Sequence, residues 1–225
     1  MLSIAEDLRL AYPGAAFGVL VMTRVSNPPF HAGLEERKRR VEEELRGRFA
    51  GMTRAELNSV EPLGAYAAYY GRFKQTYHVL LQLESVVHGG RPIPSVAALV
   101  EAMFLAELRN LLLTAGHNLA ELSFPLRLGL AEGMERYLGL DGREKTAVRG
   151  DMLLADGRGA ISSVLRGPDH RTRLKEDTGS ALFFVYAPPG IGTAPLRAHL
   201  SEIREYVQLV APGAEETTLE TVEVR

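Results

Sequence analysis

The sequence predicts an α+β fold in which mixed sheets and packed helices surround a central pocket. Helical patterns prevail in the first half and strand and hairpin patterns in the second, without the strict strand–helix alternation of a doubly wound sheet. The long apolar helix that begins after Ile93-Pro94 ends in a polar run, Thr114-Ala115-Gly116-His117-Asn118. A helix that is packed only in a core rarely needs such a run, so we expect it to point polar groups into a cavity.

The composition is that of an ordinary soluble globular protein. The 225 residues are 46% hydrophobic and 24% charged, and the formal net charge is −2, so no overall positive field attracts DNA. Cysteine is absent, which excludes disulfides, thiolate nucleophiles and cysteine metal sites and suits the cytoplasm. No apolar run reaches the ~18 residues that would span a membrane.

The first sixty residues contain four predicted elements. Their signals are apolar periodicity, Pro-Gly and Asn-Pro-Pro breaks, and a capping-box pair at Thr53 and Glu56. They predict a short helix over 2–11, a buried strand over 15–25, an amphipathic helix over 33–49 and a short helix over 53–59.

The rest of the chain adds an aromatic cluster and the remaining helices and strands. Tyrosines and Phe73 gather between residues 66 and 77 around Gly71, and Ser95 stands where it could cap the long helix. An Asp-Gly-Arg-Gly turn at 156–159 signals a hairpin. The predicted elements are helices over 77–88, 96–112 and 194–210 and strands over 124–130, 152–155, 160–165, 181–187 and 217–224.

One dense basic run, Arg37-Lys38-Arg39-Arg40, could bind phosphates. Three glutamates follow it directly, at positions 42–44. On a helix, Lys38–Glu42, Arg39–Glu43 and Arg40–Glu44 would pair four residues apart. We therefore expect a solvated helix face that neutralises itself.

The loop Gly190-Ile191-Gly192 lies between an apolar strand and the start of a helix. Its N–H groups and the helix dipole could hold an anion. It lacks the third glycine and the lysine of phosphate-binding loops, so we expect a connecting loop.

The six histidines show none of the short spacings that metal sites use. We therefore expect no metal. His117 and Asn118 fit two compatible roles, capping of the helix C-terminus and lining of a pocket. The polar stretch Asp169-His170-Arg171-Thr172 fits either an exposed loop or a ligand-binding segment.

The order of several short motifs resembles the tRNA-editing domain of phenylalanyl-tRNA synthetase, modules three and four of its beta subunit, and free-standing relatives of that domain. The resemblance covers residues 66–210, and it begins with Tyr70 and Phe73-Lys74. It continues through Gly89-Gly90, Ile93-Pro94, Leu99-Val100-Glu101, Ala115-Gly116-His117-Asn118-Leu119, Asp169, Arg171-Thr172, Glu176-Asp177-Thr178 and the strand LFFVYAPPGI.

The resemblance implies a pocket between sheet and helices, which in the synthetase hydrolyses mischarged tyrosyl-tRNA. It implies His117 and Asp169 as catalytic residues, no cofactor, and tRNA or an aminoacyl or nucleotide-like small molecule as partner. The oligomeric state stays open. The residues that it places against a substrate are Tyr70, Lys74, Met103, Phe104, Asn118, Arg171 and Thr172.

Four positions depart from the family pattern. The family's Thr-Asn pair falls on Met103-Phe104, its histidine on Ala115 and its aspartate on Asn118. These replacements imply a smaller, drier pocket without the family's water-orienting groups. Two hypotheses remain: an RNA-binding or trans-editing domain that hydrolyses mischarged aminoacyl-tRNA, and a non-catalytic module that binds an amino acid or nucleoside.

Residues 1–65 lie outside the clear resemblance. We expect them to form an N-terminal α/β extension packed on an editing-domain-like domain over 66–225, the two making one compact unit. No segment resembles the synthetase's class II catalytic core, so aminoacylation is not expected.

Overall fold

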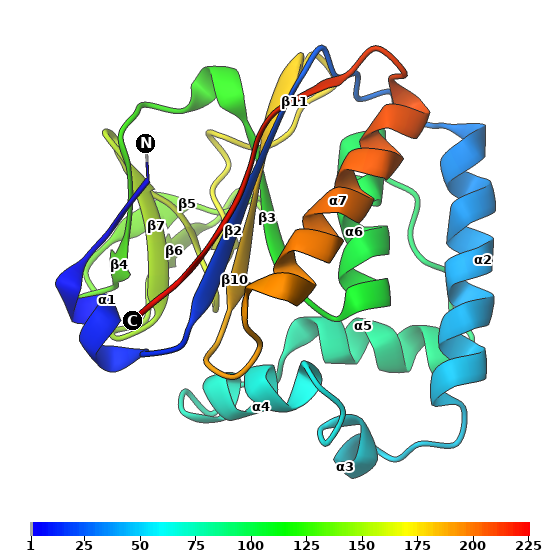
Figure 1. Ribbon diagram of the computed structural model, residues 1–225, viewed down its shortest axis with the longest axis horizontal. Helices are drawn as coiled ribbons and strands as arrows, with labels where there is room; N and C mark the ends of the chain where they lie inside the picture. Colours follow the sequence, from blue (N-terminus) through cyan, green and yellow to red (C-terminus); the bar gives the residue numbers. More distant parts are fainter. Residues whose placement is uncertain (1) are drawn as a thin grey trace.

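A computed structural model describes residues 2–225 of the chain. A four-stranded antiparallel sheet lies between a layer of helices and a second sheet (Figure 1). Its strand order is β11-β2-β10-β3, and three of its strands come from the two ends of the chain. Their bounds are β2 (Ala16–Thr23), β3 (Leu113–Asn118), β10 (Ser180–Ala187) and β11 (Glu215–Glu223).

The second sheet has the order β1-β4-β7-β8-β9 and is mixed, because β1 runs parallel to β4 whereas the other pairs are antiparallel. A separate two-stranded ribbon pairs β5 with β6. These strands are β1 (Leu2–Ile4), β4 (Leu126–Leu130), β5 (Arg136–Leu138), β6 (Glu144–Thr146), β7 (Met152–Asp156), β8 (Gly159–Ser163) and β9 (Gly167–Pro168).

Apart from α1, which packs beside β4, and the 3₁₀ turn, the helices gather on the opposite side of the four-stranded sheet. In Figure 1, α7 lies on the sheet with α6 beside it, α2 stands outside both, and α4 and α5 cross below. No helix among residues 2–225 is long and apolar enough to cross a membrane. The helices are α1 (Glu6–Ala11), α2 (Ala32–Phe49), α3 (Arg54–Leu57), α4 (Leu63–Gly71), α5 (His78–Val87), α6 (Ala98–Asn110) and α7 (Thr193–Val210), with a 3₁₀ turn η1 (Leu119–Glu121).

The α+β prediction is confirmed, and most predicted elements form within a few residues of their expected bounds. Residues 2–11, predicted as one helix, instead form β1 and then α1. The reason is tertiary: the backbone of β1 pairs with β4, 124 residues along the chain. The capping box at Thr53 and Glu56 forms as expected.

The predicted end of the long helix is wrong. The helix stops at Asn110, and Leu111 adopts the left-handed conformation at φ 59°. Residues 113–118 then form β3, antiparallel to β10, so Gly116 and His117 are strand residues and do not cap the helix. Pairing with a fully buried neighbouring strand decides the conformation of a segment whose own composition favours a turn.

The predicted self-pairing of the basic run is also wrong. Lys38 is buried, and its ammonium lies 3.3 Å from Glu101 on α6 and donates to Ser95 Oγ at 2.7 Å. Arg40 pairs backwards with Glu36. The helix is turned so that the side of Lys38 faces α6, which the local charge pattern does not reveal. Ser95 therefore holds Lys38 and does not cap α6; Asn27 does so instead, because its Oδ1 accepts from the backbone N–H of Leu99 at 2.8 Å.

Candidate functional site

A cavity of about 330 Å³ lies between α5, α6, the edge strand β3 and the segment around β9. Most of its wall is apolar, and the side chains that make this wall are Val100, Met103, Phe104, Leu113, Leu140 and Leu174. Polar groups reach it at few points, chiefly Glu107, Thr114, Ser163 and Arg173. A largely apolar hollow with a few polar groups is the usual form of a small-molecule site.

The sequence builds one wall through helical spacing. Val100, Met103, Phe104 and Glu107 recur at three- and four-residue intervals on α6 and so share one face. The facing strand offers Gly116, where a Cβ would come within 2.8 Å of Leu174 Cδ1 and 3.3 Å of Met103 Sδ. Glycine therefore allows the strand, Leu174 and Met103 to meet closely at this end of the cavity.

Glu107 is the most unusual group in the cavity wall. It is 2% exposed, and its Oε1 accepts a hydrogen bond from the backbone N–H of Thr114 at 2.6 Å. Among residues 2–225 it forms no ion pair. Burial raises its pKa to about 8, so the carboxyl is mainly uncharged at neutral pH. Glu107 is absent from the site residues predicted from the sequence, although an acid on the apolar face of a helix is a signal that could have indicated it.

Arg173 brings a positive charge to the same cavity. Its Nη1 donates to the carbonyl of His170 at 2.6 Å and approaches His170 Nδ1 at 2.9 Å. Within the described part of the chain the guanidinium contacts no carboxylate, so its charge is available to a ligand. Arg173 directly follows the polar segment Asp169–Thr172 that the sequence singled out.

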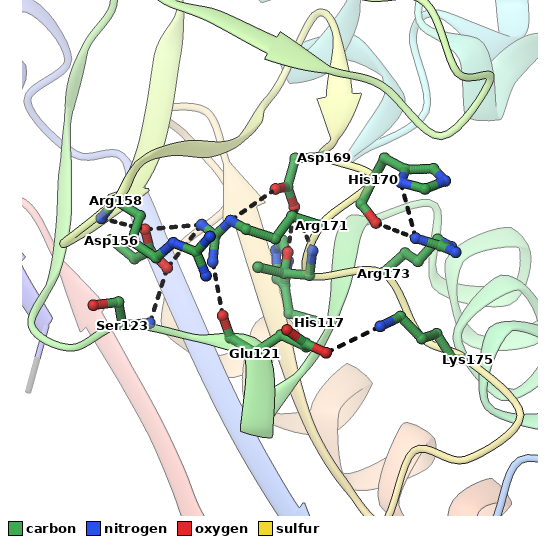
Figure 2. A network of polar contacts seen from close by, with 11 residues as sticks. His117, Glu121, Ser123, Asp156, Arg158, Asp169, His170, Arg171, Arg173 and Lys175 are labelled. Atoms are coloured by element: carbon green, nitrogen blue, oxygen red, sulfur yellow. Dashed lines mark hydrogen bonds and ion pairs between the residues drawn. The ribbon is translucent and has the colours of Figure 1, made fainter.

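The predicted catalytic residues belong to a separate polar network beside the cavity (Figure 2). Arg171 donates to both oxygens of Asp156 at 2.9 Å and to the Glu121 carbonyl at 2.7 Å. Its Nε lies 3.7 Å from Asp169 Oδ2. Asp169 also accepts from the backbone N–H of Thr172 at 3.1 Å and from its hydroxyl.

His117 contacts this network through only one of its two ring nitrogens. Its Nδ1 lies 2.6 Å from Thr172 Oγ1, and because that hydroxyl donates to Asp169, the imidazole donates to the hydroxyl. Its Nε2 is buried with no partner among the described residues. Burial, with the charge of Arg171, lowers the pKa of His117 to about 3, so the ring is neutral.

The structure therefore divides the predicted site residues into two places. Met103 and Phe104 line the cavity. His117, Asp169, Arg171 and Thr172 meet in the network of Figure 2, none of them among the lining residues. The other three lie elsewhere: Asn118 accepts from Ala120 N in η1, buried Tyr70 donates to the Val164 carbonyl at 2.8 Å, and Lys74 is exposed.

Comparison with known proteins finds similarity in structure and no match in sequence. No protein-family model matches it, and no curated protein matches its sequence. One solved structure to which it is similar is an N-terminal fragment of the phenylalanyl-tRNA synthetase beta subunit from Pyrococcus horikoshii, with a TM-score of 0.48 and 12% identity. The match covers 97% of this chain and 54% of that one, so the chain spans about half its length.

Proposed function

We propose that the protein binds a small molecule that places an apolar body in the cavity and an anionic group against Arg173. A nucleotide-like group, a free amino acid or another carboxylic acid has this chemistry. The observation that carries the proposal is the combination of an apolar wall with a cation that no carboxylate neutralises.

The position of His117 favours binding over hydrolysis. A general base must reach the proton that it abstracts, directly or through one water. The free nitrogen of His117 is fully buried, and its low pKa makes it a weak base. A non-catalytic binding module therefore accounts for the geometry with fewer assumptions.

Trans-editing hydrolysis of a mischarged aminoacyl-tRNA is a second candidate. It is favoured by one observation: α6 and β3, which carry much of the motif order that resembles the synthetase editing domain, also form the cavity. In this case the aminoacyl ester would enter the cavity and the tRNA would lie outside it.

Ligand binding is tested by thermal shift and calorimetry with hexanoate, leucine, adenosine monophosphate and bulk tRNA. We expect at least one anionic probe to stabilise the protein. Arg173→Gln should weaken that binding about tenfold, because a charge-assisted hydrogen bond is lost. Arg197→Gln, at an exposed arginine outside the cavity, is the matched control. Absence of any shift with all four probes would refute the proposal.

Hydrolysis is tested separately by incubating the purified protein with tyrosyl-tRNA. Ester decay faster than in buffer, and slower again with His117→Ala, would establish an editing activity. Decay equal to buffer in both would exclude hydrolysis of this substrate while leaving the binding proposal intact.

A further inference from the structure

Among the buried carboxyl groups in residues 2–225, Glu107 has the fewest hydrogen-bond and ion-pair partners. Four of the others contact a lysine or arginine, and Asp151 accepts from the Tyr69 hydroxyl at 2.5 Å and from Leu165 N at 3.0 Å. The four with a cationic partner are Glu42, Glu101, Asp156 and Asp169. Glu107 receives one hydrogen bond, from Thr114 N–H, although a carboxylate can accept about four.

The unsatisfied side of Glu107 faces the cavity, because the residue lines it and is 2% exposed. We propose, on the basis of the binding function above, that the ligand carries a cationic amine at the end opposite its anionic group and that Glu107 binds this amine. Glu107 is then a specificity-determining residue, and the ligand class is an ω-amino acid or a molecule with the same two charges.

Glu107 and Leu174, the residue that follows Arg173, contact different parts of the cavity wall. Leu174 meets Met103 and Gly116 at one end. Glu107 lies four residues beyond Met103 on α6, about 6 Å along the helix axis. Thr114, which holds Glu107, lies two residues before Gly116 on β3, about 7 Å along the strand. A ligand that reaches both ends needs an apolar spacer between its charges, and the apolar wall covers that stretch.

The amine end is also the better shielded end. Glu107 is buried, whereas Arg173 is half-buried and the side chain of Leu140 beside the cavity is 54% exposed. An ion pair at Glu107 is therefore little screened by solvent. A ligand without the amine would leave the carboxyl with its single hydrogen bond.

The titratable groups around Glu107 do not change charge between pH 7 and pH 9. Burial raises the pKa of the tyrosines that face it and lowers the pKa of His199, which meets Thr114 from α7, to about 4. Burial also lowers the pKa of His78 at the start of α5. The tyrosines are Tyr66 and Tyr70 from α4, Tyr77 before α5 and Tyr186 from β10.

Binding of an amine should release a proton. Glu107 is protonated in the empty cavity below its pKa of about 8 and ionised against the ammonium, so about one proton leaves at pH 7. The affinity for an amine ligand should rise about tenfold from pH 6 to pH 7 and level off above pH 8. The affinity for a ligand without the amine should not rise over this range.

The test compares 6-aminohexanoate, hexanoate and 6-hydroxyhexanoate by calorimetry in two buffers of different ionisation enthalpy. At pH 8.5 we expect 6-aminohexanoate to bind at least tenfold more tightly than hexanoate, and at pH 7 its binding should release about one proton. Glu107→Gln keeps an oxygen for Thr114 N–H. It should abolish both the preference and the proton release while hexanoate still binds.

Each other outcome has a distinct meaning. If hexanoate binds and 6-aminohexanoate binds no better, the amine proposal fails and the cavity function stands. If 6-hydroxyhexanoate binds more tightly than 6-aminohexanoate at pH 7, Glu107 acts as a neutral carboxyl that donates a hydrogen bond to the ligand, and this also overturns the proposal. If none of the probes binds, the binding function fails for this ligand class. The pH profile of the unmodified protein decides the question even if Glu107→Gln does not fold.

Discussion

At the scale of single residues, the protein keeps two titratable side chains uncharged by burying them. Glu107 lies in the cavity wall, and His117 lies in the polar network of Figure 2. Their pKa values move in opposite directions, to about 8 for the acid and about 3 for the base, because burial disfavours the charged form of each. Both groups therefore make stability depend on pH.

Glu107→Gln should stabilise the protein at alkaline pH. The native state holds the Glu107 proton more tightly than the unfolded chain does, so stability is full below pH 4.5 and is lost as the pH rises through about 8. At about 1.4 kcal/mol per pKa unit, the loss approaches about 5 kcal/mol above pH 8. Urea unfolding at pH 5 and pH 9 should show similar stability for the two proteins at pH 5 and a more stable variant at pH 9.

The matched control for this measurement is Glu36→Gln. Glu36 is an exposed carboxylate on α2, paired with Arg40. Its replacement should change the free energy of unfolding by a similar small amount at both pH values. A Glu107→Gln variant that follows the same pattern would contradict the assignment of a neutral Glu107.

At the scale of elements, single hydrogen bonds join segments that are far apart in sequence. The hydroxyl of Tyr66 on α4 donates to the Tyr186 carbonyl on β10 and accepts from Leu113 N–H at the start of β3 at 2.9 Å. Its ring stacks on Tyr77 with centroids 4.2 Å apart. One side chain thus holds the ends of two neighbouring strands at the cavity, because Leu113 and Tyr186 both line it.

Tyr66→Phe should lower the free energy of unfolding by about 1–3 kcal/mol. The ring would still fill its place, but buried backbone groups of Leu113 and Tyr186 would lose their partner. Tyr77→Phe is the control, because its hydroxyl makes one longer bond, 3.3 Å to the Leu111 carbonyl. Chemical unfolding of both variants measures the difference. If both variants lose the same free energy of unfolding, the two hydrogen bonds of the Tyr66 hydroxyl contribute no more to stability than the single bond of Tyr77.

At the scale of the whole molecule, two buried histidines set the response to acid. His117 lies in β3 and His199 in α7, with pKa values lowered to about 3 and about 4, mainly by burial. Unfolded histidines bind a proton near pH 6.5, so the unfolded state takes up more protons as the pH falls. Stability should be present above pH 6.5 and decline as the pH falls through the range between 6.5 and these lowered values.

Between pH 7 and pH 4, His117 alone should cost the native state about 3 kcal/mol. His117→Gln removes that pH dependence but also weakens the hydrogen bond to Thr172. The variant should therefore be less stable than the unmodified protein at pH 7, and this difference in the free energy of unfolding should shrink or reverse at pH 4. Thermal or urea unfolding across this range measures the difference from the unmodified protein. His88→Gln, which replaces an exposed histidine, should show the same change of stability with pH as the unmodified protein.

The sequence by itself determined the class of fold and most of the elements. Apolar periodicity found the amphipathic helices, alternation and β-branched runs found β2 and β10, and the Asp-Gly turn found the β7–β8 hairpin. These features succeed because they depend on neighbours within a few residues. Met103 and Phe104, which the family resemblance rather than periodicity places against a substrate, line the cavity from α6.

The tertiary structure alone decided how distant segments meet. Pairing with β10 made Thr114–Asn118 a strand, packing on α6 buried Lys38, and folding of the Asp169 loop over β3 enclosed His117. It also placed Glu107 and Arg173 in the wall of one cavity. Partners 55 or more residues apart leave no periodic trace in a single sequence. Burial and charge pairing, which define this site, therefore appear only once the layers are assembled.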